Sequence, residues 1–334
     1  MNNEKVLVTG GGGFLGRAVV KKLVKKGVEV RSFSRNYYEE LNFPGVVQVK
    51  GDLADKRAVT EAVTGVDVVY HIAAKAGIWG EWSDFFKVNV TGTDNVIKAC
   101  LENRVKRLIY TSSPSVVFHG DDMEGVDESV PYPAKYHAAY PETKAIAEKL
   151  VKKAGCKELA TIILRPHLIW GPKDNHLVPE LIKKAKRLKR VGNGKNLVDT
   201  IYVDNAADAH VLAADALEKN PSLSGNVYFI SQDEPVSLWQ MVDDILDAAG
   251  LPPVRGSVSA RAAFVAGSVF EFLFSFLKID KDPPMTKFVA RELATSHWFD
   301  ISKAKKDLGY FPEISTKQGL EFLRESFGII DIPT

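Results

Sequence analysis

The chain has 334 residues, of which 45% are hydrophobic and 26% charged, and 44 Lys and Arg against 42 Asp and Glu leave a net charge of +2. This composition is that of a folded globular protein and excludes a disordered or fibrous chain. Such a small net charge predicts neither nucleic acid nor an anionic membrane as a partner. The two distant cysteines, Cys100 and Cys156, and a polar start that resembles no signal peptide predict a cytoplasmic protein with two incidental thiols.

The first half of the sequence alternates short β-branched runs with longer amphipathic runs. The predicted strands are Val6–Val8, Glu29–Ser32, Val46–Lys50, Val66–His71, Arg107–Thr111 and Thr161–Leu164. The predicted helices are Phe14–Lys26, Arg57–Val63, Phe85–Glu102 and Pro141–Lys153. Because alternating strands and helices build a parallel sheet covered on both faces, we expect an α/β fold with a doubly wound parallel sheet, the Rossmann fold. We place this domain at residues 1–171.

Residues 172–334 have a different texture, in which helical patterns dominate. Strand-like pieces remain at Leu197–Val203 and Asn226–Ser231. We expect a smaller, mostly helical substrate-binding region that packs on the first domain, with segments that can return to the sheet.

One segment of this region, Ala262–Leu277, is strongly aromatic and carries Glu271. It is too short and too charged for a membrane span. We interpret it as a helix lining the substrate pocket, with a membrane surface or a second subunit as the alternatives.

The first turn of the chain has a dinucleotide-binding pattern. Val6–Thr9 runs into Gly10, Gly13 and Gly16 and then into a helix that begins with Phe14 and Leu15. Glycine permits the tight turn and the close approach of a pyrophosphate, which then lies at the positive end of the helix. In this strand–turn–helix context the spacing predicts a nicotinamide dinucleotide as cofactor.

The end of the second strand indicates which dinucleotide is bound. NAD-binding proteins place an acid there for the ribose hydroxyl, but here the position is Ser34, followed by Arg35. Because Arg pairs well with phosphate, NADP(H) is favoured and NAD(H) remains the alternative. Asp52, after the third strand, is expected to meet the adenine, and its alternative role is a helix N-cap.

Tyr140 and Lys144 lie four residues apart at the start of a predicted helix, so they share one face. We expect the Lys144 ammonium to lower the pKa of the phenol and to make Tyr140 a general acid/base. Ser112 and Ser113, after the preceding strand, can hydrogen-bond the substrate oxygen. The pattern predicts proton transfer coupled to hydride transfer.

Motifs along nearly the whole chain resemble those of an extended short-chain dehydrogenase/reductase. The chain is similar to the branch that contains 3β-hydroxysteroid dehydrogenases and sterol-4α-carboxylate 3-dehydrogenases, and to bacterial 2-alkyl-3-oxoalkanoate reductases. The segments that carry this resemblance are Thr9–Gly16, Gly51–Leu53, His71–Ala74, Asn89–Thr93, Tyr110–Phe118, Tyr140–Lys144, Arg165–Pro172, Tyr202–Asn205 and Ser302–Tyr310.

The resemblance implies Ser113 as the catalytic serine, Tyr140 as the acid/base and Lys144 as the residue that orients the nicotinamide ribose. It further implies a set of cofactor contacts and a homodimer built through the Phe85–Glu102 and Pro141–Lys153 helices. The implied contacts outside the glycine turn are Leu53, Ala73, Ala74, Pro166 and His167. The steroid enzymes commonly use NAD and carry an acidic residue after the second strand. This chain lacks that acidic residue, which departs from the family pattern.

Other chemistries fit the sequence less well. None of the seven histidines forms a His-x-x-x-His pair, so no metal site is predicted. The basic run Lys183–Arg190 is interpreted as a solvated helix face, with nucleic-acid or lipid-headgroup contact as the weaker alternative, so no nucleic-acid partner is predicted.

We therefore predict an NAD(P)-dependent oxidoreductase that interconverts a 3-hydroxy group and a 3-ketone on a long-chain acyl or steroid-like substrate, in the cytoplasm or at a membrane. Two alternatives use the same fold. One is a nucleotide-sugar epimerase or dehydratase, and the other is a non-catalytic dinucleotide sensor.

Overall fold

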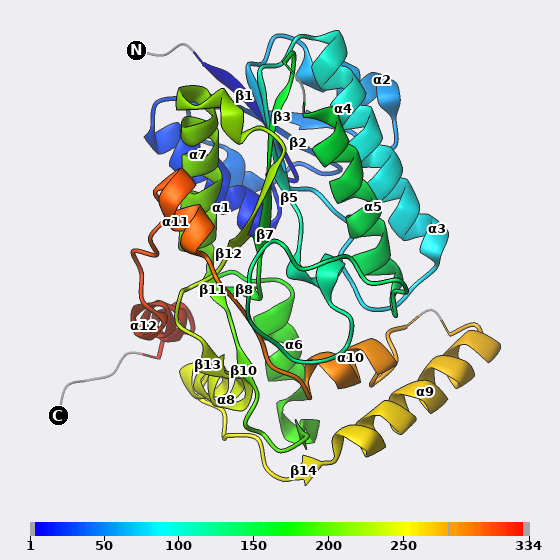
Figure 1. Ribbon diagram of the computed structural model, residues 1–334. Helices are drawn as coiled ribbons and strands as arrows, with labels where there is room; N and C mark the ends of the chain where they lie inside the picture. The colour runs from blue at the N-terminus through cyan, green and yellow to red at the C-terminus, as the bar shows by residue number, and fades with distance from the viewer. Residues whose placement is uncertain (1–3, 156, 280, 330–334) are drawn as a thin grey trace, which may run out of the picture.

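The computed structural model describes residues 4–155, 157–279 and 281–329, and its centre is a seven-stranded parallel sheet (Figure 1). Every neighbouring pair of strands in this sheet runs parallel. Across the sheet the strands are β12 (Asn226–Ile230), β7 (Ala160–Pro166), β5 (Arg107–Thr111), β4 (Val68–His71), β1 (Lys5–Thr9), β2 (Glu29–Ser34) and β3 (Val46–Lys50). The prediction of a doubly wound parallel sheet is confirmed. The strand order reverses between β1 and β4, where sheets of this kind bind ligands.

Helices cover both faces of the sheet (Figure 1). One face carries α2 (Lys56–Val63), α4 (Gly92–Glu102) and α5 (Ala139–Ala154), and the other carries α1 (Phe14–Lys25), α7 (Val203–Lys219) and α11 (Ser302–Leu308). Strands β4 and β5 therefore have no exposed residue. Burial on both sides explains why their sequences are almost continuously apolar.

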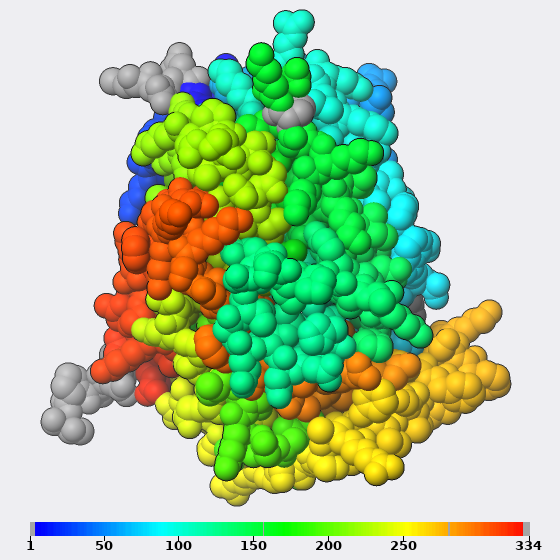
Figure 2. All heavy atoms as spheres, in the orientation of Figure 1, coloured from blue at the N-terminus to red at the C-terminus, as the bar shows by residue number. Residues whose placement is uncertain are grey.

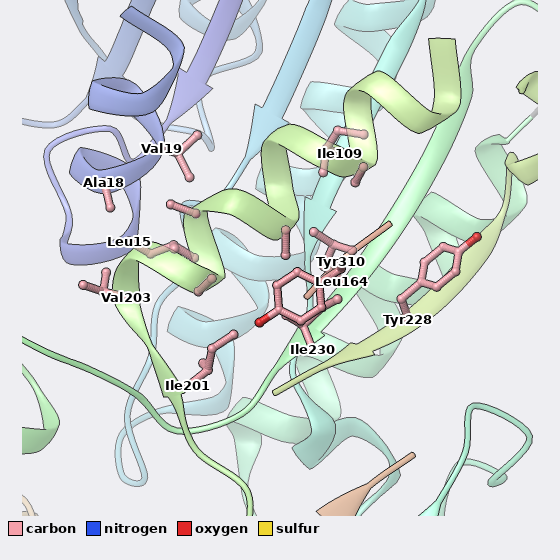
Figure 3. Close-up of a cluster of buried hydrophobic side chains, with 14 of the residues drawn as sticks. Leu15, Ala18, Val19, Ile109, Leu164, Ile201, Val203, Tyr228, Ile230 and Tyr310 are labelled. Atoms are coloured by element: carbon pink, nitrogen blue, oxygen red, sulfur yellow. The ribbon is translucent and has the colours of Figure 1, made fainter. Parts of the chain in front are cut away.

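A large part of the core lies between the sheet and the layer of α1 and α7. Figure 3 shows Leu15 of α1, Ile109 of β5 and Leu164 of β7 as members of this buried cluster, with the ribbon of α7 crossing the view. The buried face of α7 is largely alanine, including Ala206 and Ala209, which are fully buried. Small side chains let this helix lie close to the sheet.

Three elements beyond residue 171 belong to the sheet or to the helix layer on one of its faces, namely β12, α7 and α11. Strand β12 pairs with β7, and α7 packs against α1, so the second region does return segments to the sheet. Its other elements lie beyond the carboxyl ends of the strands (Figure 1). They are helices α6 (Leu177–Lys184), α8 (Leu238–Ala248), α9 (Ala260–Phe276), α10 (Lys287–Glu292) and α12 (Thr316–Ser326), and strands β9 (Arg190–Val191), β10 (Leu197–Val198), β11 (Ile201–Tyr202), β13 (Val236–Ser237), β14 (Ser257–Val258) and β15 (His297–Phe299). Two short strands from before residue 171 join them, because β6 (Met123–Val126) pairs with β15 and β8 (Ile169–Trp170) pairs with β11.

The predicted strand Leu197–Val203 is wrong as a single element, because β10 and β11 belong to different sheets. The polar pair Asp199 and Thr200 separates them. The Asp199 carboxylate accepts from the backbone of Phe299 at 2.8 Å, and the Thr200 hydroxyl oxygen accepts from the indole of Trp170 at 3.2 Å. These buried hydrogen bonds turn the chain between the two short strands.

Candidate active site

A cleft of about 830 Å³ lies at the carboxyl ends of the sheet strands. Fifteen of the sixteen predicted site residues line it. They are Gly10, Gly13, Phe14, Leu15, Gly16, Ser34, Arg35, Asp52, Leu53, Ala73, Ala74, Ser113, Tyr140, Lys144 and Pro166. Their positions span most of the first half of the chain, and the parallel sheet brings them to one edge.

The glycine turn is built so that side chains would not fit. Gly10 has a φ of +71°, and a Cβ atom there would lie 2.9 Å from the Cα atom of Ala73. A Cβ atom on Gly16 would overlap the carbonyl oxygen of Gly10. Gly13 is the N-cap of α1, so the backbone N–H groups of Phe14 and Leu15 lie in a first turn without earlier helical carbonyls to bond. This cradle at a helix N-terminus fits the pyrophosphate of a dinucleotide.

The end of β2 also faces the cleft. The Ser34 hydroxyl oxygen accepts from the backbone N–H of Gly12 at 3.3 Å, and the exposed Arg35 follows it. Asp52 accepts from the backbone of Ala54, whereas the N-cap of α2 is Asp55. The alternative interpretation of Asp52 as a helix N-cap is therefore wrong.

A buried network joins the ends of β1 and β4 to α4. Thr93 donates its hydroxyl proton to the carbonyl of Asn89 at 2.6 Å, so the Nε2–H of His71 donates to Thr93 at 3.0 Å. Nδ1 of His71 then accepts from the Thr9 hydroxyl at 2.8 Å, and the Thr9 oxygen accepts from the backbone of Ala73. Burial lowers the pKa of His71 to about 3, so the ring stays neutral. The network fixes the loop that carries Ala73.

The predicted helix Phe85–Glu102 contains an irregularity. The chain forms the short helix α3 (Trp82–Phe85), a π-helical segment (Phe86–Thr91) and then α4. Within the π-helical segment the Asn89 side chain accepts from the backbone N–H of Lys75 at 2.7 Å, and it donates to the Thr143 hydroxyl at 3.1 Å. It therefore links the loop after β4 to the start of α5. Such π-bulges occur frequently at functional sites.

Helix α5 carries both Tyr140 and Lys144 into the cleft. Lys144 donates to the phenol oxygen of Tyr110 at 2.7 Å and to the carbonyl of Thr111 at 2.6 Å. Burial raises the pKa of Tyr140, while a hydrogen bond with Ser113 opposes this rise and the charge of Glu292 adds to it. The prediction that Lys144 lowers the pKa of Tyr140 is therefore wrong for this structure.

Lys144 itself has an altered pKa. Burial lowers it to about 7, and the charge of Glu148 acts in the opposite direction. The Glu148 carboxylate is fully buried and accepts from Ser112 at 2.5 Å, from Tyr132 at 2.6 Å and from Arg165 at 2.6 Å. Burial opposes its charged form, but these hydrogen bonds outweigh burial and lower the pKa of Glu148. Ser112, the serine next to Ser113, therefore donates its hydroxyl proton to the buried Glu148–Arg165 ion pair.

His167 lies outside the cleft lining. Its Nε2 atom lies 2.8 Å from Nδ1 of His297, and its backbone N–H donates to Ile230 at 3.3 Å. The His297 Nε2–H donates to the backbone carbonyl of Glu292 at 2.9 Å, which makes its Nδ1 the acceptor from His167. The imidazole of His167 therefore packs into the second region, and only its neighbours Pro166 and Leu168 line the cleft.

Three further features named in the sequence can be located among the described residues: the aromatic segment, the metal-ligating residue types and Cys100. Residues 260–276 do form a helix, α9, but none of them lines the 830 Å³ cleft, because α9 packs on α10 instead. Across the described ranges, no group of three or more His, Cys, Asp or Glu side chains is placed to hold a metal. Burial raises the pKa of the Cys100 thiol to about 12, so this cysteine is no nucleophile at neutral pH.

Comparison with known proteins identifies the family. Residues 7–257 match the model of the 3-beta hydroxysteroid dehydrogenase/isomerase family. The chain belongs to this family. It is 47% identical to a 2-alkyl-3-oxoalkanoate reductase of Stenotrophomonas maltophilia, over 96% of this chain and 99% of that protein. It is 34% identical to a decarboxylating sterol-4-alpha-carboxylate 3-dehydrogenase of Mus musculus, over 97% of this chain and 91% of that protein.

These relationships confirm the predicted resemblance to the 3β-hydroxysteroid dehydrogenase branch. Because the family's named members are reductases and dehydrogenases, this chain is an oxidoreductase acting on CH–OH groups, and the family is NAD(P)-dependent. The fold also resembles that of a UDP-glucuronic acid 4-epimerase from Bacillus cereus in complex with NAD, with a TM-score of 0.73 at 22% identity over 97% of this chain and 99% of that one. At 22% identity, this similarity shows that the two proteins share a fold and nothing further.

Proposed function

We propose that this family member is an NADP(H)-dependent reductase that interconverts the 3-ketone and 3-hydroxyl groups of a 2-alkyl-3-oxoalkanoate-like acid. The observation that carries the proposal is the meeting of Ser113, Tyr140 and Lys144 with the glycine turn in one cleft. The 47% identity to a 2-alkyl-3-oxoalkanoate reductase, against 34% to the sterol enzyme, supports an acyl substrate.

The residues of the cleft fit the cofactor. The cradle formed by Gly10, Gly13 and Gly16 would hold the pyrophosphate, Arg35 the 2′-phosphate, and Lys144 the nicotinamide ribose. Asp52 and Leu53 would line the adenine side, and Ala73, Ala74 and Pro166 the groove between. When bound, NADP(H) supplies or accepts the hydride at the nicotinamide C4 atom.

Tyr140 holds the proton that the substrate oxygen needs. Because its pKa is raised, the phenol is protonated at neutral pH, which suits a general acid in the reductive direction. In that direction the phenol donates its proton to the ketone oxygen, and Ser113 donates a hydrogen bond to the same oxygen. In the oxidative direction the phenolate accepts the hydroxyl proton. The Lys144 ammonium, one helical turn away on α5, is bonded to Tyr110 and Thr111, and its proposed role is to orient the nicotinamide ribose.

We also propose a homodimer formed through the layer of α4 and α5, as the resemblance implies. Sedimentation equilibrium of the purified protein tests it directly. A dimer mass is the expected result, and a monomer at micromolar concentration would contradict it.

The experiment that tests the proposed reaction compares substrates and cofactors on the purified enzyme. We expect NADPH-dependent reduction of a 2-alkyl-3-oxoalkanoate to the 3-hydroxy acid, identified by mass spectrometry, with NADH at least about tenfold less effective because it lacks the phosphate for Arg35. Oxidation of a 3β-hydroxysterol acid in preference would move the substrate to the steroid class. Conversion of UDP-glucose with no net cofactor turnover would replace reduction by epimerisation.

A further inference from the structure

One face of helix α9 has no packing partner among the residues that the structure describes. Along this face lie Val265, Val269, Phe272, Phe276 and other apolar side chains at helical spacing. Phe272 is 68% exposed and Phe276 73%, and their rings stack on each other at the surface. Six of the fourteen large hydrophobic side chains exposed in the described chain fall between residues 265 and 277. Isolated exposed apolar residues are ordinary, but such a concentration marks an interaction surface.

The opposite face of α9 is firmly attached to the protein. A Cβ atom on Gly267 would lie 2.6 Å from the backbone of Thr286, so α9 and α10 are in close contact there. The Glu271 carboxylate accepts from the backbone N–H of Lys287 at 2.7 Å and pairs with its ammonium at 2.9 Å. The one acidic side chain of the helix is therefore turned inward, and the bare outer stripe carries no charge between Arg261 and Lys278.

A basic cluster lies beside the first turn of α9. The basic run Lys183–Arg190 ends in strand β9, which pairs with β14. Strand β14 ends at Val258, two residues before α9 begins at Ala260. The Nζ atom of Lys189 reaches within 3.1 Å of where a Cβ atom on Gly256 would lie, so the two segments are in contact. The exposed cations of this cluster that form no ion pair within the described ranges are Lys186, Arg187, Lys189, Arg255 and Arg261.

The arrangement in space places both features at the edge of the molecule. Figure 1 shows α9 along the outer margin of the second region, away from the sheet, with β14 at its first turn. In Figure 2 the same segment forms a protruding ridge of the surface. A convex apolar ridge next to a cluster of cations matches the interfacial layer of a bilayer, where acyl chains receive the aromatic side chains and anionic headgroups receive the cations.

We propose that the outer face of α9 and the adjoining basic cluster form a docking surface for a membrane that contains anionic phospholipid. A second copy of the chain fits less well. Cations bound the stripe at both ends, Arg261 at one and Lys278 at the other, so pairing two such ridges in either direction places cation beside cation. The ion pairing of Glu271 with Lys287 removes the carboxylate that could have offset them.

Binding to vesicles tests the docking surface without substrate or cofactor, so its outcome is separate from that of the proposed reaction. The full-length protein is sedimented with phosphatidylcholine vesicles that contain about one third phosphatidylglycerol, and with vesicles of phosphatidylcholine alone. We expect the partition coefficient to be at least about tenfold higher with the anionic lipid and to fall as salt is raised, because several cations contribute.

Two variants separate the apolar and the basic contributions. Phe272→Glu with Phe276→Glu should lower binding at least about tenfold, whereas Phe311→Glu, an equally exposed phenylalanine outside α9, should leave binding unchanged. Lys186→Ala, Lys189→Ala and Arg261→Ala together should abolish the preference for anionic lipid. The matched control for charge is Lys21→Ala, Lys25→Ala and Lys306→Ala, three exposed lysines outside this surface.

Absence of binding to the anionic vesicles would overturn the proposal, as would binding that neither the aromatic nor the basic variant reduces. A dimer that Phe272→Glu with Phe276→Glu converts to a monomer, with vesicle binding unchanged, would assign the ridge to a second copy of the chain instead. Thermal unfolding of each variant verifies that it is folded.

Discussion

The ammonium of Lys144 lies 2.7 Å from the phenol oxygen of Tyr110, a buried residue of β5. The same ammonium donates to the carbonyl of Thr111 at 2.6 Å. Lys144 is thus positioned by the sheet before any ligand binds, and its side chain does not depend on Tyr140 for its place. Burial lowers the pKa of Lys144 to about 7, while the charge of Glu148 favours the ammonium form.

Tyr110→Phe should therefore weaken cofactor binding. The change removes one of the two acceptors of Lys144, and a hydrogen bond to a charged group contributes about 1.5–3 kcal/mol, so we expect a roughly tenfold higher cofactor Kd. Tyr70→Phe, in the neighbouring buried strand β4, is the matched control and should leave the Kd unchanged. Equal binding by the Tyr110 variant and the wild type in a fluorescence titration would show that Thr111 alone positions the ammonium.

Arg35→Ala should discriminate between the two cofactors. Arg35 is exposed at the rim of the cleft beside Ser34, where it can pair with a 2′-phosphate. We expect NADPH to bind at least about tenfold more weakly and NADH nearly as before, measured by titration. Arg35→Lys should be intermediate, because lysine keeps the charge without the bidentate geometry. Equal losses for both cofactors would remove the phosphate role from Arg35.

Glu292 should influence both the pH profile and stability. Burial raises its pKa to about 7, and its charge raises the pKa of Tyr140. In the oxidative direction the rate rises with pH as Tyr140 loses its proton, so Glu292→Gln should shift this limb to lower pH. The folded protein binds a proton between pH 4.5 and 7 that the unfolded chain does not bind. That contribution to stability is therefore complete below pH 4.5 and is lost as pH rises through 7.

Urea unfolding at pH 5 and pH 8 measures this contribution. Relative to Glu292→Gln, the wild type should lose about 1–3 kcal/mol of unfolding free energy between the two pH values. Glu321→Gln, an exposed carboxylate on α12, is the control and should follow the wild type. If Glu292→Gln changed neither the pH profile of oxidation nor the pH dependence of unfolding, Glu292 would have no influence on the pKa of Tyr140.

Asn89→Ala should impair activity beyond its effect on stability. Its buried amide joins the backbone of Lys75 to Thr143 in the first turn of α5, close to Tyr140. Loss of these bonds should cost about 1–3 kcal/mol of unfolding free energy and lower kcat at least about tenfold. Asn205→Ala breaks a comparably buried amide that bonds Gln232 and Ile314, and it should lose stability but little activity. Equal activity losses in the two variants would make Asn89 merely structural.

The sequence predicts the sheet well because its signals are local. Val6–Val8 is a continuous apolar run, Arg107–Thr111 has three such residues at its centre, and the spacing of Gly10, Gly13 and Gly16 depends only on one turn. Tyr140 and Lys144 are likewise one helical turn apart. The cleft position of the residues around them follows from parallel strands ending at the same edge.

The contacts between distant segments could not be predicted in the same way. Thr9 and His71 are 62 residues apart, and only the pairing of β1 with β4 places their side chains together. Asn89 and Thr93 stand in a family-like motif, but nothing in their spacing shows that they bond Lys75 and His71. The sequence marks Ala262–Leu277 as strongly aromatic, but it does not tell which face of the helix is covered, so a pocket lining, a membrane surface and a second subunit all stay open from the sequence alone.

The role of Tyr140 is tested by NADPH-dependent reduction of a 2-alkyl-3-oxoalkanoate by Tyr140→Phe, beside the wild type and a Tyr136→Phe control whose hydroxyl donates to the carbonyl of Val116 at 3.0 Å. We expect a kcat at least about a hundredfold lower for Tyr140→Phe, with NADPH affinity unchanged, because only the transferred proton is lost. Retention of more than about one hundredth of the wild-type rate would contradict the role of Tyr140.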